Sequence, residues 1–130
     1  MDKSLFERGL AARKAVLGSD YVEKSLTQAD EFSRPLQELV TEYCWGAIWT
    51  REGLPRKTRS LLNLAMLATL NRQHELKLHV MGALRNGCTQ TEIQEALLQV
   101  TIYAGVPAGV EAFRTARAAI AEYGAAAPKG

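Results

Sequence analysis

The sequence predicts an all-α domain, and three observations carry that prediction. The chain of 130 residues contains 19 alanines and 17 leucines against 7 valines and 4 isoleucines, a composition that favours helices over strands. No stretch alternates polar and apolar side chains as a half-buried strand does. Capping residues, prolines and glycines divide the chain into about six helices. We expect a compact bundle over residues 1–124 and a disordered tail over 125–130.

The first helix is expected to begin at Ser4, because Ser4 and Glu7 have the spacing of a capping box. Gly18 follows the last apolar pair of this helix and predicts its end. Residues 19–32 are expected to form a loop or a short helical turn.

The next helix is expected to begin near Pro35, with Ser33 as its cap, and it carries two stripes. The apolar stripe has helical spacing and predicts the side that faces the core: Leu36, Leu39, Val40, Tyr43, Cys44, Ala47 and Ile48. The opposite stripe contains Glu38, Glu42, Trp45 and Trp49. Tryptophans that face away from their own core are seldom left in water, so we expect Trp45 and Trp49 at a subunit contact or lining a pocket.

Four helices are predicted in the remainder of the chain. The first of them opens at Pro55 and is uncharged from Ser60 to Asn71, which predicts a central helix buried on nearly all sides. Thr89 and Glu92 form a second capping box. Asn86-Gly87, Gly105 and Pro107 supply the remaining boundaries. The expected ranges are about 55–71, 73–86, 89–104 and 107–124.

Charge and cysteine content exclude several classes of protein. Sixteen basic against fourteen acidic residues leave a net charge of +2, too small for a nucleic-acid-binding surface. The longest uncharged run has 15 residues, which is short for a membrane-spanning helix, and the N-terminus lacks the apolar segment of a signal peptide. Cys44 and Cys88 form neither a disulfide framework nor a CxxC pair. We therefore expect a cytoplasmic protein.

Basic residues gather before and within the first turns of the helix that opens at Pro55: Arg51, Arg56, Lys57 and Arg59. Cations there oppose the helix dipole. One interpretation is an anion held by the free N–H groups of the helix start and an arginine. The alternative is pairing with Glu38, Glu42 or Glu52, or simple solvation.

His79 is predicted on the apolar side of its helix, beside Leu76 and Val80. Such a histidine is either a satisfied core residue or a proton donor near neutral pH. His74 lies five residues earlier, about 140° away around the helix. The two rings cannot share a metal from one face, so no metal site is predicted.

Four segments carry a resemblance to a known family: RKAVLGSDYV (13–22), TEYCWGAIWTREGLPRKTRSLLNLAMLATLN (41–71), LHVMGALRNGCTQTEIQEALLQ (78–99) and YAGVPAGVEAFRTA (103–116). They resemble the γ-carboxymuconolactone decarboxylase family, within the alkylhydroperoxidase D-like superfamily. The resemblance implies an all-α fold and a homo-oligomer, most often a hexamer. It also implies cofactor-independent conversion of 4-carboxymuconolactone to 3-oxoadipate enol-lactone and CO2, in the β-ketoadipate pathway of protocatechuate degradation.

The implied substrate is a lactone with two carboxylates, and it suggests roles for the unusual residues. His79 would donate a proton to the product carbon or a hydrogen bond to the lactone oxygen, and Glu42 would orient His79 or an arginine. Arg51 or Arg59 would clamp a carboxylate. The full substrate-binding set is expected to be Arg51, Arg59, Trp45, Trp49 and Tyr103, with the tryptophans as walls and Tyr103 as a further donor.

Two other functions stay open at this point. A non-catalytic helical module that binds an anionic metabolite would use the same residues. Thiol peroxidase relatives carry a CxxC followed four residues later by a histidine. Here Arg72 and Glu75 occupy the cysteine positions, and Ser60 replaces a glutamate used upstream, which argues against peroxidase activity.

Overall fold

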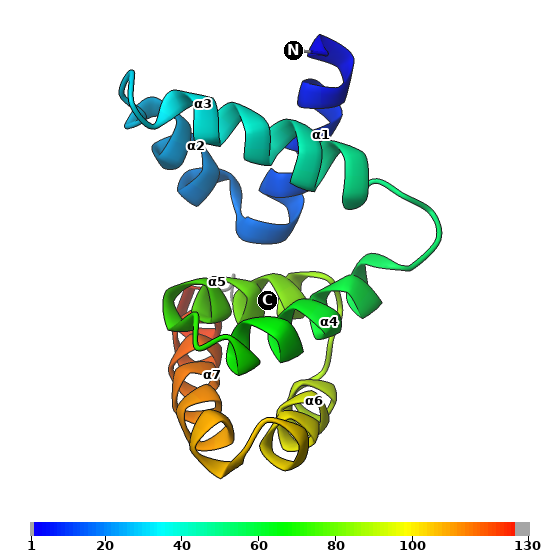
Figure 1. The fold of residues 1–130 in the computed structure, drawn as a ribbon, viewed down its shortest axis with the longest axis vertical. Helices are drawn as coiled ribbons and strands as arrows, with labels where there is room; N and C mark the ends of the chain where they lie inside the picture. The colour runs from blue at the N-terminus through cyan, green and yellow to red at the C-terminus, as the bar shows by residue number, and fades with distance from the viewer. Residues whose placement is uncertain (1, 127–130) are drawn as a thin grey trace. The chain divides into compact units, whose positions relative to one another are not determined.

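The computed structural model describes residues 2–126, and every regular element among them is helical (Figure 1). Seven α-helices and one π-helix lie in this range, so the prediction of an all-α fold is confirmed. The chain divides into two compact units, Met1–Arg56 and Lys57–Gly130. None of the described helices has the length and apolar character needed to cross a membrane.

The first unit contains α1 (Lys3–Leu17), α2 (Ser19–Thr27), α3 (Arg34–Leu39) and η1 (Val40–Ile48). The capping box predicted at Ser4 is wrong, because Asp2 is the cap and its carboxylate accepts a hydrogen bond from the Leu5 N–H. Gly18 ends α1 with a positive φ of 94°. The segment expected as a loop or short turn contains the nine-residue helix α2. Ser33 precedes α3 but bonds to Asp30 instead of capping the helix.

The helix that follows Pro35 changes its hydrogen bonding along its length. It begins as α3 and continues without a break as the π-helix η1, in which each N–H bonds to the carbonyl five residues earlier. α1 packs against η1, and their backbones come very close. A Cβ on Gly9 would lie 2.0 Å from the Thr41 carbonyl oxygen, and one on Gly46 would lie 2.5 Å from that of Leu5.

The face of η1 that is buried is the reverse of the predicted one. Trp45 and Trp49 are only 3% and 4% exposed, whereas Tyr43 is 63% and Ile48 50% exposed. The prediction assumed 3.6 residues per turn throughout, which a π-helix does not have. It also weighed apolar area alone, whereas the close approach of α1 requires the glycine-containing face. The expectation that the tryptophans point away from the core is therefore wrong.

The second unit contains α4 (Arg56–Thr69), α5 (Gln73–Arg85), α6 (Gln90–Tyr103) and α7 (Val106–Ala126). Its core is built from α4, α5, α6 and α7 around Leu64, Leu76, Val80, Ile93 and Leu97. α4 buries one face only, and Leu62, Met66 and Leu70 are about half exposed or more. The prediction that α4 is buried on nearly all sides is thus wrong within the single chain.

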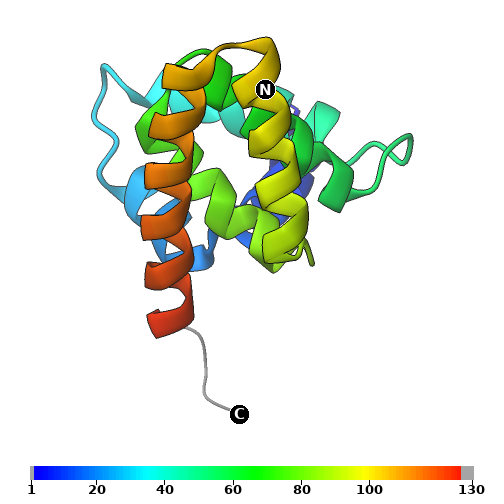
Figure 2. The ribbon, with the colours of Figure 1, turned by 90° about the horizontal axis from the view of Figure 1, so that it is seen from below.

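The ends of the helices in the second unit follow the predicted signals closely. The Thr89–Glu92 capping box at α6 is formed in both directions. Gly87 and Gly105 have φ of 90° and 110°, a conformation that favours glycine. Gly105 reverses the chain, so that α6 and α7 pack side by side (Figure 2). α7 continues through Ala126, two residues into the expected tail, and residues 127–130 lie outside the described part.

Candidate active site

The predicted site residues divide between the two units. The first unit holds Glu42, Trp45, Trp49 and Arg51, and the second holds Arg59, His79 and Tyr103. The expected contact between Glu42 and His79 would join the two units, and it stays a prediction.

Trp45 and Trp49 form one aromatic unit on the buried side of η1. Their ring centroids are 4.7 Å apart and their planes are inclined by 20°, which is a stacked arrangement. The spacing of four residues on the π-helix places one indole over the next. With exposed fractions of 3% and 4%, the pair is a rigid apolar body.

Glu42 and Arg51 lie at opposite ends of the same region. Glu42 is half-buried on η1, and its Oε1 accepts a hydrogen bond from the Asp2 backbone N–H at 3.3 Å. Arg51 is exposed just after η1, where its N–H donates to the Ile48 carbonyl. Arg51 can therefore be reached by an anion from solvent.

A hydrogen bond between side chains fixes the pairing of α4 with α5 in the second unit. Asn86 Nδ2 donates to Ser60 Oγ at 2.9 Å, and Ser60 is fully buried. Arg59 is the residue before Ser60, and His79 is seven residues before Asn86. This hydrogen bond thus joins the first half of α4 to the C-terminal end of α5.

His79 lies on the buried face of α5, as predicted, among Leu76, Val80 and Ala83. Its side chain is 8% exposed, and this burial lowers the pKa of His79 to about 4. The imidazole is therefore neutral near pH 7, when its N–H is a hydrogen-bond donor but not a strong acid. His74 is exposed on the opposite side of α5. Residues 2–126 contain no cluster of three His, Cys, Asp or Glu side chains suited to a metal ion.

Tyr103 is 83% exposed at the end of α6. It contributes to a shallow hollow of about 320 Å³ between α4 and α6, together with Ala65, Thr69 and Val100. His79 and Arg59 are not among the residues that line it.

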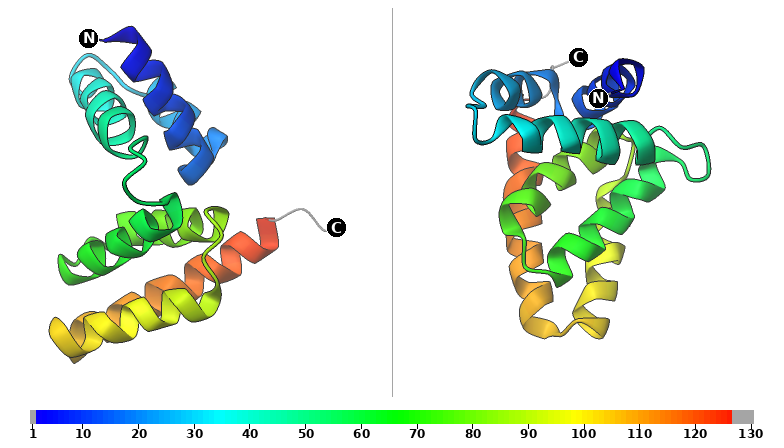
Figure 3. Two further views of the ribbon diagram at one scale, coloured as in Figure 1. Left: turned by 90° about the vertical axis from the view of Figure 1, so that its right-hand side faces the viewer. Right: turned by 45° about the horizontal axis from the view of Figure 1, so that its top comes forward.

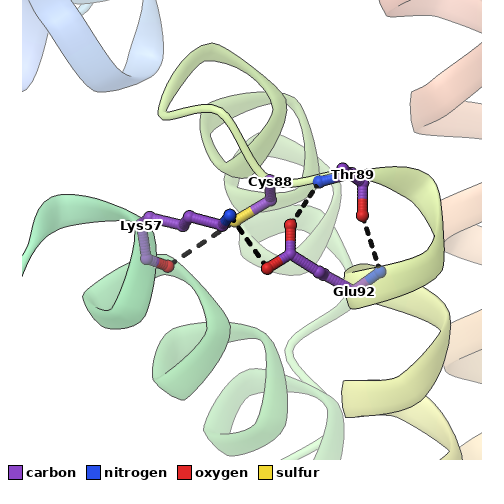
Figure 4. A network of polar contacts seen from close by, with 4 residues as sticks. All are labelled: Lys57, Cys88, Thr89 and Glu92. Atoms are coloured by element: carbon purple, nitrogen blue, oxygen red, sulfur yellow. Dashed lines mark hydrogen bonds and ion pairs between the residues drawn. The ribbon is translucent and has the colours of Figure 1, made fainter.

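The basic cluster at the start of α4 has a partner that the sequence did not indicate (Figure 4). Lys57 Nζ forms an ion pair with Glu92 Oε2 at 2.9 Å, and the Lys57 carbonyl accepts a weak hydrogen bond from Cys88 Sγ at 3.5 Å. The Thr89 backbone N–H, followed by Lys57, holds the pKa of the Glu92 carboxyl below its usual range. Lys57 therefore links α4 to the start of α6. Its partner is Glu92 and not one of the predicted alternatives Glu38, Glu42 and Glu52.

Neither cysteine has the character of a redox centre. Cys44 is exposed on η1 and Cys88 is buried before α6, and both are free thiols. Cys44 is exposed as a residue, but neighbouring protein atoms keep water from its sulfur, and this desolvation raises the pKa of the Cys44 thiol as it does that of Cys88. A raised pKa lowers the fraction of reactive thiolate. This agrees with the missing CxxC.

Another hollow in the second unit involves none of the predicted residues. It is a groove of about 560 Å³ between α6 and α7, with Arg114 and Arg117 on one wall and Gln90 and Gln94 on the other. The spacing of each pair indicates only a shared helix face, and the groove itself depends on how α6 packs against α7. We do not assign this groove to catalysis, because it contains none of the residues for which the resemblance suggests a role.

Comparison with known proteins identifies the family. A model described as the carboxymuconolactone decarboxylase family matches residues 34–118. The 4-carboxymuconolactone decarboxylase of Acinetobacter baylyi is 37% identical over 128 residues, which is 98% of this chain and 96% of that protein. The nitrosuccinic acid decarboxylase of Metarhizium robertsii is 48% identical over 112 residues, 86% of this chain and 78% of that protein. The resemblance drawn from the motifs is thus confirmed, and the chain belongs to the carboxymuconolactone decarboxylase family.

Proposed function

We propose that this protein removes CO2 from 4-carboxymuconolactone and releases 3-oxoadipate enol-lactone. The observation that carries the proposal is the similarity to a 4-carboxymuconolactone decarboxylase along nearly the whole of both chains. The reaction belongs to the protocatechuate branch of the β-ketoadipate pathway, and we place it in the cytoplasm, where free thiols such as Cys44 persist.

The substrate supplies its own electron sink. Breaking the bond to the departing carboxylate leaves an electron pair on the ring carbon, and conjugation through the ring double bond carries it to the lactone carbonyl oxygen. The protein then has to hold the remaining carboxylate, stabilise the developing oxyanion and allow protonation of the α carbon. Side chains alone can meet these requirements, so we propose no cofactor.

His79 is proposed as the donor to the lactone oxygen. Of its two predicted roles, hydrogen-bond donation is the one that a pKa of about 4 supports, because a neutral imidazole keeps one N–H. Glu42 is proposed to orient His79 or an arginine. Arg51 or Arg59 would hold the spectator carboxylate as a bidentate fork. Tyr103 is proposed as a further donor to the substrate.

The stacked pair of Trp45 and Trp49 is proposed to form an apolar wall. Since both rings are almost fully buried, their contribution would be to exclude water near the departing carboxylate and to hold η1 rigid. They would present an edge to the substrate rather than enclose it.

Nitrosuccinate is a second candidate substrate, and the 48% identity to a nitrosuccinic acid decarboxylase favours it. Its chemistry is parallel, because the nitro group accepts the electron pair left by CO2 as a nitronate. Both candidates are dicarboxylates in which the carbon that loses CO2 is joined to an electron sink, directly in nitrosuccinate and through the ring double bond in the lactone. The same arginine, hydrogen-bond donor and apolar wall would serve either one.

The test is CO2 release from each substrate by the purified protein, with a chelator present in a parallel assay. We expect turnover of the lactone, unchanged by the chelator and by the double change Cys44→Ser, Cys88→Ser. A protein that is stabilised against heat by the lactone but releases no CO2 would be the non-catalytic binding module. Faster turnover of nitrosuccinate than of the lactone would identify nitrosuccinate as the substrate.

Variants of the site test the roles of its residues. His79→Leu, which has no N–H to donate, should bind product and turn over about 10²–10³-fold more slowly, whereas His74→Leu, on the exposed side of α5, should resemble the parent. Arg51→Lys and Arg59→Lys keep the charge but lose the fork, so the one that acts as the clamp should raise KM with little change in kcat. An unchanged KM in both arginine variants would show that neither arginine holds the spectator carboxylate.

We also propose that the protein is a homo-oligomer, with a hexamer as the expected state. Large apolar side chains remain exposed on α3 and η1, among them Leu36, Leu39, Tyr43 and Ile48. Exposed apolar area of this kind marks contact surfaces between proteins. Sedimentation equilibrium tests the proposal, and a stable monomer at micromolar concentration would overturn it.

A further inference from the structure

The groove between α6 and α7 has an apolar floor that belongs to the core of the second unit. Ile93 and Leu97 form the floor from α6 and are each 1% exposed, and Phe113 and Ile120 add half-buried side chains from α7. The two helices pack together from the turn that joins them and diverge away from it (Figure 3). At about 560 Å³, the groove falls within the range of small-molecule sites.

Polar groups line the groove on both sides. Arg114 and Arg117 are one turn apart on α7, and both are exposed. Arg114 forms an ion pair with Glu111. Within residues 2–126, no carboxylate lies at ion-pair distance from Arg117. Gln90 and Gln94 are one turn apart on α6 and bring amide groups to the opposite wall.

The groove lacks the features of a surface for another protein. The exposed large apolar residues of α6 and α7 gather toward the turn that joins the helices: Leu98, Ile102, Tyr103, Val106 and Val110. None of them lines the groove. Its apolar groups are recessed and its charged groups are at the rim, which suits a small ligand with an apolar body and a charged end.

We propose that this groove is a binding site for a small amphipathic carboxylate, separate from the residues proposed for decarboxylation. The hydrocarbon part would lie on the half-buried side chains of Phe113 and Ile120, above Ile93 and Leu97. The carboxylate would accept hydrogen bonds from the Arg117 guanidinium, whose planar fork matches it. A neutral ligand of the same shape would leave that interaction unused.

Octanoate is the probe, with octanamide as its uncharged equivalent, and binding is measured by calorimetry on the full chain. Octanoate should bind, and octanamide should bind at least tenfold more weakly. Arg117→Gln should weaken octanoate binding by about 10–100-fold, since a hydrogen bond to a charged group contributes on that scale. Arg72→Gln removes the same charge from an exposed position of the second unit outside the groove and should leave binding unchanged.

A filling variant tests the location without removing charge. Gln94 is exposed on the rim, so Gln94→Trp adds volume to the groove without disturbing the core, and it should block octanoate. CO2 release should be unchanged in Gln94→Trp and Arg117→Gln. Equal binding of octanamide, or full binding by both variants, would overturn the proposal. Loss of turnover in these variants would indicate that the groove is the active site, and a change in oligomer mass would indicate that it is a subunit contact. Either result would also overturn the proposal of a separate binding site.

Discussion

The helix that carries the tryptophans and the helix that carries His79 are buried by different means. η1 meets α1 through its backbone, because Gly9 and Gly46 leave no room for even a methyl group at the contact. α5 is an ordinary α-helix that contributes side chains such as Leu76, Val80 and Ala83 to a shared apolar core. The position of η1 against α1 therefore depends on the hydrogen-bonding pattern of its backbone and on two small residues. The position of α5 in its core depends on the volume and spacing of its side chains.

The two helices also contribute differently to the proposed site. A π-helix is rare and is found frequently at functional sites. In η1 it brings Trp45 and Trp49 into a stack and keeps Glu42 on a partly buried edge. α5 instead holds one polar ring in an apolar setting, which changes the protonation of His79. One helix therefore supplies shape to the proposed site, and the other supplies a tuned polar group.

The largest expected effect tests which face of η1 is buried. Trp45→Ala should lower the free energy of unfolding by about 3–5 kcal/mol, because it removes a buried indole and leaves a cavity. Tyr43→Ala is the matched change on the opposite face, where the ring is 63% exposed, and should cost about 0.5 kcal/mol or less. Chemical denaturation of both variants measures the difference. A larger cost for Tyr43→Ala would restore the face predicted from the apolar stripe.

The next largest effect tests the backbone contact itself. Gly9→Ala should lower the free energy of unfolding by about 3 kcal/mol, because the new methyl group would lie 2.0 Å from the Thr41 carbonyl oxygen. Gly53→Ala is the control, since a Cβ at Gly53 meets no atom within 4 Å. Thermal and denaturant unfolding of the two variants should differ clearly. Equal stability would mean that α1 and η1 are not in close contact.

The same comparison explains what the sequence could predict. Helix ends were predictable where a few neighbouring residues determine them, as with Thr89 and Glu92 or the left-handed Gly87. The buried face of α5 was predictable because its spacing is that of a regular α-helix. The face of η1 was not, because both stripes are largely apolar and the deciding contact involves Gly9, distant in sequence. The Lys57–Glu92 pair and the α6–α7 groove depend on tertiary contacts in the same way.

A smaller effect concerns the burial of His79. Its pKa is about 6.5 in the unfolded chain and about 4 in the folded one, so between these values the unfolded chain binds more protons. The contribution of the neutral His79 ring to the free energy of unfolding is therefore fully present above pH 6.5 and is lost as the pH falls toward 4. At pH 5 the loss should be about 2 kcal/mol relative to pH 7.

Denaturation of the parent and of His79→Asn at pH 7 and pH 5 measures this contribution. The variant should lose about 2 kcal/mol less than the parent between the two pH values, while His74→Asn, which retains His79, should follow the parent. An identical pH dependence in the parent and His79→Asn would show that the ring is not held neutral by burial.

The smallest effect compares two serine/threonine positions that look alike in sequence. Thr89 and Ser4 each precede a glutamate by three residues, but only Thr89 caps its helix, while Asp2 does so for α1. Thr89→Ala should therefore lower the free energy of unfolding by about 1 kcal/mol, and Ser4→Ala should change it by less than about 0.5 kcal/mol. Asp2→Ala should cost about as much as Thr89→Ala, because it removes the bond to the Leu5 N–H. If Ser4→Ala cost more stability than Asp2→Ala, α1 would begin at the Ser4–Glu7 capping box instead of at Asp2. The hydrogen bond from the Asp2 N–H to Glu42 would then not belong to the contact between α1 and η1.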